Sequence, residues 1–541
     1  MSGKSQTFVR GAFSLALAGL ISKILGVVYV VPLQNMIGDY GIGLYQFAYP
    51  VYTTMLILST AGFPLAMSKS VAERVALSDF DGADQIYRAA SRLMIITGIV
   101  TFLLMYLLSP YLAKWDGNVN ATLAMRAIAF ALLIVPPLSA MRGFMQGNHH
   151  MKASGNSQVV EQFVRVGFIV FGTWWVLHLG YTAKEGAAAA TFGGAIGALA
   201  SLIYLYIHVR RLRRSYEPRM TGQVALDSWT VVKNLSKYAL PISLGALVLP
   251  ISSSVDSFTI TNLLHVAGMP IDEATEQFGI FTGRALRLIQ LPLSFATAMG
   301  LSLMPAITEA ITLKNEKLLQ ERVQISFRLN ALITLPAAAI LIALPTEINI
   351  MLFKDAQGAP VVASVALMSV FAAYELVTTY ILQGIGKFYL PVGNMMFGTF
   401  CKLLFNIFLV PRFGIIGAAY ATVIAYLISS GLNVRAVLKY TKVRLHLGVL
   451  LVRPVITSAI MGLALWFTRQ GVHSLLVGII PNERILSTVV LFLVLPVGFA
   501  IYMAALLMLG GLERKEVGYI PFFGKYLLRI LDRVAVRSTR G

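Results

Sequence analysis

The sequence predicts an all-α polytopic membrane protein of about fourteen transmembrane helices, with two six-helix lobes around a central cavity and two further C-terminal helices. Composition is the first reason: of the 541 residues, 57% are hydrophobic and only 13% are charged, which is typical of a chain whose main solvent is lipid. Apolar stretches of the roughly 20 residues that cross a bilayer recur along almost the whole length. Basic residues cluster in short segments on alternate sides of these stretches, as the positive-inside rule requires.

The first part of the chain contains six apolar stretches. They predict helices near residues 11–37, 46–73, 90–112, 121–146, 157–180 and 186–208, which together form an N-lobe over residues 1–209. The stretch at 11–37 follows a basic segment with Lys4 and Arg10. Because it is long and lacks a small-residue cleavage site, we interpret it as a retained helix and expect no signal peptide.

The second part repeats this organisation after a basic linker. Residues 210–234 are rich in arginine and polar side chains and are predicted to form a cytoplasmic linker. Helices are expected near 235–263, 279–311, 328–352, 361–385, 389–411 and 415–437, in a C-lobe over 235–440, and near 448–469 and 486–510, in a C-terminal pair over 441–512. Residues 513–541 mix apolar and basic side chains, in the pattern of a cytoplasmic, interfacial amphipathic helix.

The distribution of charge indicates a membrane rather than nucleic acid as the partner. The chain carries 44 Lys and Arg against 24 Asp and Glu, a formal net charge of +20. Counting sides from a cytoplasmic N-terminus places most of these cations in cytoplasmic loops, where anionic lipid headgroups attract them. We therefore expect an even number of helices, both termini in the cytoplasm and no nucleic-acid partner.

Short matches between the two parts predict an internal repeat. Gln146-Gly147 ends one expected helix and Gln383-Gly384 ends its counterpart, and Gly186-Ala187-Ala188 recurs as Gly417-Ala418-Ala419. Because each repeat holds an even number of helices, both have the same orientation and are related by an axis along the membrane normal. Two parallel lobes of this kind predict a central cleft that rocks between inward-open and outward-open states.

Nothing in the sequence indicates a cofactor. Cys401 is the single cysteine, so no intramolecular disulfide forms. His149 and His150 lack a further His or Cys at ligand spacing, so we assign no metal. There is no Walker A pattern, which excludes ATP as the direct energy source. Whether Na⁺ or H⁺ serves as a coupling ion stays open.

Charged residues inside a predicted helix need a reason, because each costs roughly 2.5 to 3.5 kcal/mol at the bilayer centre. Lys23 lies midway along the first expected helix, and we interpret it as a cation that faces the cavity and contacts substrate, with pairing to a carbonyl or a carboxylate as the alternative. Lys69, nearer the cytoplasmic end of the second helix, is either a second substrate contact or a lysine that snorkels to the interface.

The expected helix at 279–311 carries the most informative charges. Arg284, Arg287 and Gln290 recur at i, i+3 and i+6, which places both arginines on one face with Gln290 beside them. The guanidinium group matches phosphate oxygens bidentately, so a diphosphate headgroup is a suitable ligand. Asp256, in the preceding helix, joins this site or instead neutralises one arginine as a structural pair.

A second group of charges is predicted to act in gating. Arg142, Glu161 and Arg165 flank one cytoplasmic loop, and the i, i+4 spacing of Glu161 and Arg165 allows a salt bridge along one helix. Glu375 and Lys402 occupy similar places in the C-lobe. These charged residues either form permanent structural ion pairs or act as gates whose ion pairs break and reform during transport, and both interpretations stay open.

Several short segments resemble one family. Residues 22–26 (SKILG), 142–147 (RGFMQG), 157–162 (SQVVEQ), 287–292 (RLIQLP) and 414–419 (GIIGAA) are similar to segments of the MurJ/SpoVB-type polysaccharide exporters of the multidrug/oligosaccharidyl-lipid/polysaccharide (MOP) flippase superfamily. The similarity covers nearly the whole chain. Where Gram-negative members carry an Arg-Asp pair after the first-helix glycine, this chain has Tyr29-Val30, so it resembles more closely the branch of Gram-positive, spore-forming bacteria.

This resemblance implies a function. It indicates a flippase for lipid II, or for a related undecaprenyl-diphosphate-linked sugar, that serves peptidoglycan biosynthesis and cell shape in the bacterial cytoplasmic membrane. The two extra helices would form a groove for the lipid tail, and Lys23 and Arg287 would take the places of cavity arginines. The expected partners are the anionic lipid-linked precursor, the membrane and the cell-wall synthesis machinery.

Other functions stay open as alternatives. A drug/cation antiporter of the same superfamily would need buried carboxylates, for which Asp256 and Glu375 are the clear candidates, whereas cations dominate the predicted cavity. Another undecaprenyl-linked glycan would use the same cationic cavity. An embedded glycosyltransferase would need a catalytic carboxylate or histidine and a large outer loop, and no long loop is present, so we expect no enzyme. A scaffolding protein could keep the fold without transport.

Overall fold

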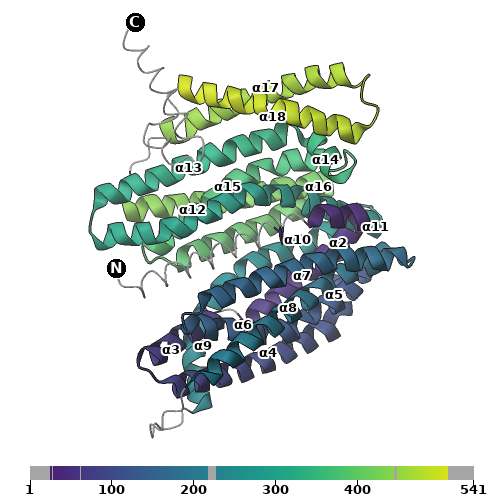
Figure 1. Ribbon diagram of the computed structural model, residues 1–541. Coiled ribbons are helices and arrows are strands. Elements are labelled where there is room, and N and C mark those ends of the chain that lie inside the picture. Colours follow the sequence, from purple (N-terminus) through teal and green to yellow (C-terminus); the bar gives the residue numbers. More distant parts are fainter. Residues whose placement is uncertain (1–24, 27–28, 61, 217–226, 444–447, 510–541) are drawn as a thin grey trace. The chain divides into compact units, whose positions relative to one another are not determined.

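The computed structural model describes residues 25–26, 29–60, 62–216, 227–443 and 448–509. Across these ranges all regular secondary structure is helical, and eleven helical segments are long and apolar enough to cross a membrane (Figure 1). The all-α polytopic class is therefore confirmed. The count of about fourteen stays a prediction, because most of the helix expected at 11–37 lies outside the described residues, as do residues 513–541.

The first long helix begins at Val30. The helices that follow to the end of the first group are α2 (Val30–Thr60), α3 (Phe63–Ala76), α4 (Phe80–Trp115), η1 (Val119–Ala121), α5 (Thr122–Ala129), α6 (Ala131–Gly147), α7 (Met151–His178) and α8 (Ala183–Arg214). Helix α4 begins ten residues before its apolar stretch, because the Asp79 side chain caps it by accepting a hydrogen bond of 2.8 Å from the Gly82 amide. Hydropathy locates the apolar part of a helix and misses such polar first turns.

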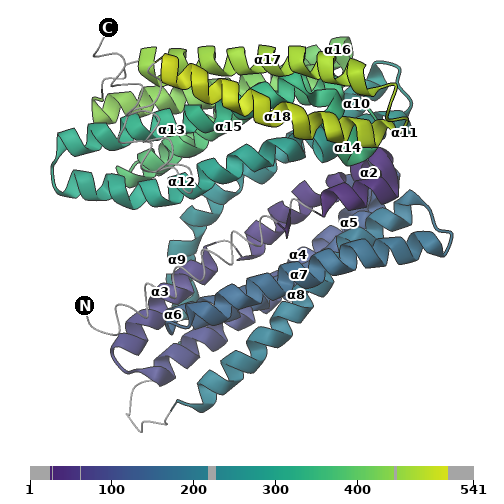
Figure 2. The ribbon, with the colours of Figure 1, turned by 45° about the horizontal axis from the view of Figure 1, so that its top comes forward.

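The remaining helices continue from Ser228. They are α9 (Ser228–Ala246), α10 (Val248–Val266), α11 (Ile271–Gly279), the π-helical η2 (Ile280–Ala285), α12 (Leu286–Thr312), α13 (Glu316–Ala343), α14 (Pro345–Phe353), α15 (Ala359–Gly384), α16 (Tyr389–Thr441), the π-helical η3 (Gly448–Val452), α17 (Arg453–Leu476) and α18 (Glu483–Met508). The helix pair α17 and α18 lies side by side in both ribbon views (Figure 2). Most of them correspond to expected apolar stretches, whereas α11, with Asp272, Glu273 and Glu276, is a polar helix that hydropathy did not predict.

Two of the long helices bend at a glycine with positive φ. Helix α2 is interrupted at Gly38 (φ 68°, ψ 179°) and α16 at Gly414 (φ 59°, ψ −142°). Both bends fall where the hydropathy of the sequence separates two expected helices, after residue 37 and between residues 411 and 415. Each of these long helices therefore covers parts of two predicted helices. The bend falls at a glycine because glycine adopts these backbone angles without a Cβ penalty.

Contacts divide the chain into two units. Unit 1 comprises Met1–Arg287 and Thr399–Ala421, and unit 2 comprises Leu288–Gly398 and Thr422–Gly541. The expected grouping into two six-helix lobes, a linker and a C-terminal pair stays a prediction.

Glycines allow the helices of unit 1 to approach closely. A Cβ on Gly43 would lie 2.3 Å from the carbonyl oxygen of Thr275, so α2 and α11 pack backbone against backbone. A Cβ on Gly197 would lie 2.6 Å from the carbonyl oxygen of Glu161, which brings α8 equally close to α7. Small residues at such crossings are the usual way to pack helices in a membrane, where lipid removes the hydrophobic drive for association.

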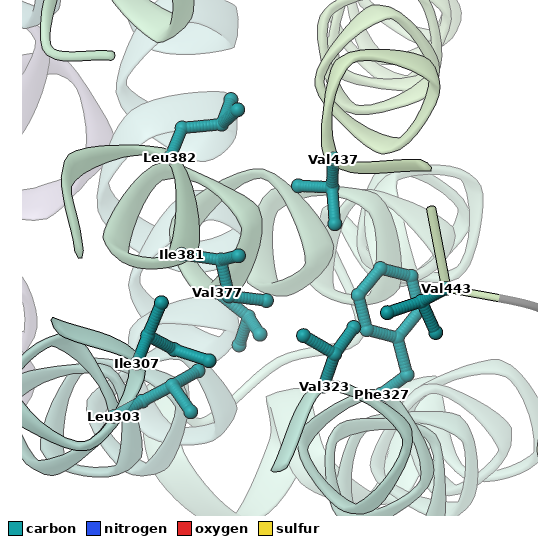
Figure 3. Packing of buried hydrophobic residues seen from close by; sticks show 9 residues of the cluster. All are labelled: Leu303, Ile307, Val323, Phe327, Val377, Ile381, Leu382, Val437 and Val443. Carbon is teal, nitrogen blue, oxygen red and sulfur yellow. The ribbon is translucent and has the colours of Figure 1, made fainter. Parts of the chain in front are cut away.

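The core of unit 2 is an apolar cluster shared by α12, α13, α15 and α16 (Figure 3). Its buried members are Leu303, Ile307, Val323, Phe327, Val377, Ile381, Leu382, Val437 and Val443. The C-terminal pair is attached to the same unit by polar contacts. The Tyr502 hydroxyl of α18 donates to the Leu332 carbonyl of α13 at 2.9 Å, and Arg469 of α17 pairs with the buried Glu347 of α14.

The two matching Gln-Gly motifs occupy equivalent positions. Gly147 ends α6, and a Cβ there would lie 2.7 Å from the Ser68 carbonyl of α3. Gly384 ends α15, and a Cβ there would lie 3.0 Å from the Met304 carbonyl of α12. Each glycine therefore lets the end of its helix approach the second expected helix of its group, as the proposed repeat predicts.

Candidate functional site

A buried ion pair joins α2 to η2 within unit 1. Arg284 binds the Asp39 carboxylate with two nitrogens: Nε donates to Oδ1 at 2.8 Å, and Nη2 donates to Oδ2. Only 3% of the Arg284 side chain and 6% of the Asp39 side chain are exposed. Gln34 Nε2 donates to the same carboxylate. Such a bidentate, buried arrangement makes Asp39 the main partner of Arg284.

The local sequence explains how this pair forms. Gly38 interrupts α2 directly before Asp39, and Gly279 lets the facing helix approach, because a Cβ there would lie 1.9 Å from the Asp39 carbonyl oxygen. Arg284 then lies in the π-helical turn η2. Such turns widen a helix by one residue and are frequent at functional sites.

Arg287, three residues further on, has a neutral partner. Its Nη2 donates to Gln46 Oε1 of α2 at 3.3 Å, and within the described part of the chain it forms no ion pair. Tyrosines line the same helix. The Tyr45 and Tyr49 rings lie 5.1 Å apart between centroids, and the Tyr29 and Tyr45 hydroxyls share a hydrogen bond of 2.7 Å.

A second network ties together α6, α7 and α8. Glu161 accepts from Arg142 Nη2 at 2.7 Å and from Arg165 Nη2 at 2.5 Å. Arg142 also donates to Ser157 Oγ at 3.0 Å and to Ser201 Oγ at 3.1 Å. The pair between Glu161 and Arg165 is the one that their spacing predicts, whereas the Arg142 contact crosses between helices. These bonds fix the guanidinium groups in place.

The second network carries an excess of positive charge. Within the part of the chain that the structure describes, Glu161 is the one carboxylate that pairs with Arg142 and Arg165, and the three side chains are 13% to 19% exposed. Arg165 Nε is buried and has no hydrogen-bond partner within the described ranges. Tyr29 and Tyr49 lie close enough to interact electrostatically with Arg165. A buried guanidinium with an unused donor favours an anionic ligand.

Asp256 and Lys402 form a third buried pair in unit 1. Lys402 Nζ of α16 lies 2.5 Å from Asp256 Oδ2 of α10, and both side chains are less than 7% exposed. Asn406 Nδ2 donates to Asp256 Oδ1 at 3.5 Å. Asp256 is therefore paired with Lys402, 146 positions later in the chain. The structural alternative had instead expected one of the arginines, Arg284 or Arg287, as its partner.

Glu375 lies in unit 2 among neutral groups. Its Oε1 accepts from Thr379 Oγ1 at 3.2 Å and from Asn433 Nδ2 at 3.5 Å, and Asn394 Nδ2 donates in turn to Asn433 Oδ1 at 2.8 Å. The side chain is buried. The site thus holds a carboxyl group by amide and hydroxyl donors, with no ion pair inside the described ranges.

Asp116, in the loop between α4 and η1, is a buried carboxyl group that the sequence analysis did not single out. Its Oδ1 accepts from the Ser257 hydroxyl, and its Oδ2 has no partner within the described residues. Burial raises the pKa of Asp116 well above its usual range, against a smaller lowering by the Ser257 hydrogen bond.

Two of the predicted contacts are exposed in the structure. The side chain of Lys69 is 56% exposed and lies 3.9 Å from Glu73 on the same helix. Gln290 is exposed on α12. A third predicted contact, Lys23, lies outside the described residues, so its role stays a prediction.

Asp39, Gln46 and the tyrosines of α2 are not among the site residues predicted from the sequence. Asp39 fell into the loop expected between two helices, although it is the first carboxylate of the whole chain. Tyr45, Tyr49 and Tyr52 recur at i, i+4 and i+7, which places their rings on one face of a helix. These two signals were present in the sequence, but without the fold nothing connected them to Arg165 or Arg284.

Comparison with known proteins gives consistent matches. Residues 8–311 match the model of a family described as polysaccharide biosynthesis protein. The chain is 30% identical to the Bacillus subtilis protein named lipid II flippase MurJ, covering 96% of this chain and 98% of the relative. It is 30% identical to the uncharacterized membrane protein YabM (95% of each chain) and 26% identical to stage V sporulation protein B (97% and 99%), both from B. subtilis.

Solved structures share the fold. The inward closed conformation of the lipid II flippase MurJ matches with a TM-score of 0.66 at 16% identity, over 91% of this chain and 97% of the other. An inward-facing multidrug resistance MATE family transporter of the MOP superfamily matches with a TM-score of 0.62 at 15% identity, over 80% and 98%.

Proposed function

The chain belongs to the polysaccharide biosynthesis protein family, within the MurJ/SpoVB-type branch of the MOP flippase superfamily, and from this premise we propose that it moves lipid II from the inner to the outer leaflet of the cytoplasmic membrane by alternating access. Lipid II is the undecaprenyl-diphosphate-linked precursor of peptidoglycan. A multi-pass membrane transporter with both termini in the cytoplasm suits this task, because only the charged headgroup must cross inside protein while the lipid tail stays in lipid.

The observation that carries the proposal is the uncompensated positive charge of unit 1. Among the described residues, Arg165 shares a carboxylate with Arg142 and keeps a buried Nε without a hydrogen-bond partner. Arg287 donates to the amide oxygen of Gln46 and forms no ion pair within the same residues. Arginine forks bind phosphate oxygens bidentately. We assign Arg165 and Arg287 to the diphosphate, and we assign Arg284 to the structural pair with Asp39.

The remaining site residues receive roles from their contacts. The Lys402–Asp256 pair is proposed as a gate, because it is buried, spans two helices and could release when they separate. Arg142 and Glu161 hold Arg165 in place. Lys23 stays a proposed cavity cation on the resemblance alone.

Two observations favour other substrates. YabM and stage V sporulation protein B are about as similar to this chain as the lipid II flippase is, so another undecaprenyl-linked glycan is the second candidate. The shared fold of the MATE transporter and the buried Glu375 keep a drug/cation antiporter as the third. The two functions depend on different residues: a drug/cation antiporter needs an ionisable carboxyl group to bind the cation or proton, whereas a flippase for a diphosphate needs the arginines to bind the anionic headgroup.

Depletion of the protein in its native cell tests the proposal. Lipid II accessible on the outer face should fall and lipid II inside should accumulate. Wild type should restore export, whereas Arg165→Gln and Arg287→Ala, at equal protein levels, should reduce it at least about tenfold, since each removes a charge-assisted contact to the headgroup.

The matched control is Arg412→Ala. Arg412 is exposed, and its one hydrogen bond among the described residues goes to the Phe408 carbonyl of its own helix, at 3.0 Å, so this variant should export lipid II normally. Unchanged export after depletion, in cells without a redundant flippase, would refute the lipid II assignment. Loss of a different undecaprenyl-linked glycan from the outer face would then establish the second candidate.

A further inference from the structure

One end of unit 2 holds a cavity of about 520 Å³ that the proposed transport does not use. Three lysines line it, Lys314 after α12, Lys387 after α15 and Lys442 at the end of α16. Leu319 and Ile385 also line it and pack against the apolar cluster of Figure 3, so the cavity opens directly beside the core of the unit. We call this cavity, lined by the three lysines, the lysine pocket.

The lysine pocket has an excess of positive charge. Glu316 is the one carboxylate among its lining residues, and none of the three lysines forms an ion pair with a carboxylate of the described residues. Lys387 Nζ instead lies 4.9 Å from the centre of the Tyr440 ring, which is a cation–π contact. With three lysines and one carboxylate, the lining carries a net formal charge of +2, which attracts an anion.

Backbone conformation gives independent support. Lys314 (φ 51°) and Lys442 (φ 53°) both adopt the left-handed conformation that ends a helix. Gly386, two residues after the end of α15, adopts it as glycine (φ 80°). A lysine in this conformation costs free energy that glycine avoids, and residues held in this way cluster at ligand sites.

We propose that the lysine pocket binds a phosphate-bearing anion, either the headgroup of an anionic lipid or free phosphate. Its volume lies within the range of small-ligand sites, about 300 to 1,000 Å³. The start of α13, capped by Asn315, adds the partial positive charge of a helix N-terminus. The positive-inside pattern assigns this end to the cytoplasmic surface, where anionic headgroups are concentrated.

This inference does not rest on the lipid II assignment, because the lysine pocket and the arginines of unit 1 have no residue in common. The test uses the full-length protein purified in detergent, and the readout is the melting temperature against probe concentration. The probes are dioctanoyl phosphatidylglycerol, dioctanoyl phosphatidylcholine and inorganic phosphate. The key variant is the triple substitution Lys314→Gln, Lys387→Gln and Lys442→Gln.

Phosphatidylglycerol should raise the melting temperature of wild type, and the triple variant should need on the order of tenfold more lipid for the same shift. The zwitterionic phosphatidylcholine should give no shift that depends on the three lysines. If phosphate gives the same lysine-dependent shift, the ligand is the free anion, and if only phosphatidylglycerol does, it is the lipid headgroup. Equal shifts in wild type and the triple variant with both anionic probes would overturn the proposal.

Two further variants test whether the shift reflects binding at the lysine pocket. The first controls for the loss of positive charge in general, and the second controls for a change in the stability of the fold. The triple substitution Lys152→Gln, Lys233→Gln and Lys317→Gln removes the same charge from exposed positions outside the cavity and should leave the shift intact. The double substitution Lys314→Gly and Lys442→Gly should raise the melting temperature without ligand, because it relieves the backbone strain, and still weaken the response to the anion. Loss of the shift in the first variant, or an intact shift in the second, would contradict a specific site.

Discussion

At the scale of single residues, the described structure separates charges that are matched from charges that are not. Arg284 and Lys402 are each neutralised by one buried carboxylate, whereas Arg165 and Arg287 keep capacity for another ligand. All four belong to helices with strongly apolar sequence, so the amino-acid composition of these helices does not distinguish the paired cations from the others. The difference lies in the partner, which determines whether a buried cation is structural or available to a substrate.

The Asp39–Arg284 pair gives a first prediction at this scale. Arg284→Met alone leaves the Asp39 carboxylate buried without its partner and should destabilise the protein by about 3 to 5 kcal/mol. The double variant Arg284→Met/Asp39→Leu should recover most of that loss, measured as the melting temperature in detergent. It should also still export lipid II, because the pair is structural. A stable double variant that exports none would instead make Arg284 a substrate contact.

Asp116 gives a second prediction, on pH. Its folded-state pKa lies well above the unfolded value of 3.8, so the neutral carboxyl group is the form that stabilises the fold. This contribution is present below pH 3.8 and is lost as the pH rises through the folded-state pKa. Asp116→Asn, which stays neutral, should therefore gain stability over wild type as the pH is raised from about 4 to 8.

Melting curves of both proteins across this pH range provide the measurement. Asn can still accept the hydrogen bond from Ser257. Asp116→Ala leaves that hydroxyl unpaired and should lose about 1 to 3 kcal/mol at every pH. A difference between wild type and Asp116→Asn that does not change with pH would contradict the raised pKa.

At the scale of elements, glycines determine where helices bend and where they touch. Gly38 and Gly414 interrupt helices that would otherwise run straight. Gly279 lets α11 contact α2 at the site of the buried ion pair. The positions of these glycines are visible in the sequence, but which of them bends a helix and which serves a contact depends on the neighbouring backbone.

A matched pair of substitutions tests this role. Gly279→Ala places a Cβ 1.9 Å from the Asp39 carbonyl oxygen and should lower stability by at least about 1 to 3 kcal/mol. Gly167→Ala, within α7, meets nothing within 4 Å and should raise stability by about 0.5 to 1 kcal/mol, because alanine favours a helix. Melting temperatures that change with the same sign in both variants would argue against packing as the cause.

At the scale of the whole molecule, membrane potential and charge act together in the proposed transport. A diphosphate headgroup that moves outward from a negative interior gains about 2.3 kcal/mol per elementary charge at 100 mV. Buried cations compensate the cost of bringing this charge into a low-dielectric interior. The excess of arginine in unit 1 is consistent with that need.

The sequence by itself determined the all-α membrane class, most of the described helix positions, the Glu161–Arg165 pair and the family resemblance, because each depends on residues close together in the chain or on overall composition. Only the tertiary structure decided that Asp39 binds Arg284, that Asp256 binds Lys402 and that three lysines from three helix ends line one cavity. The physical reason is that a local pattern sets which face of a helix is polar. Which helix that face meets is set by the packing of backbones that lie far apart in the chain.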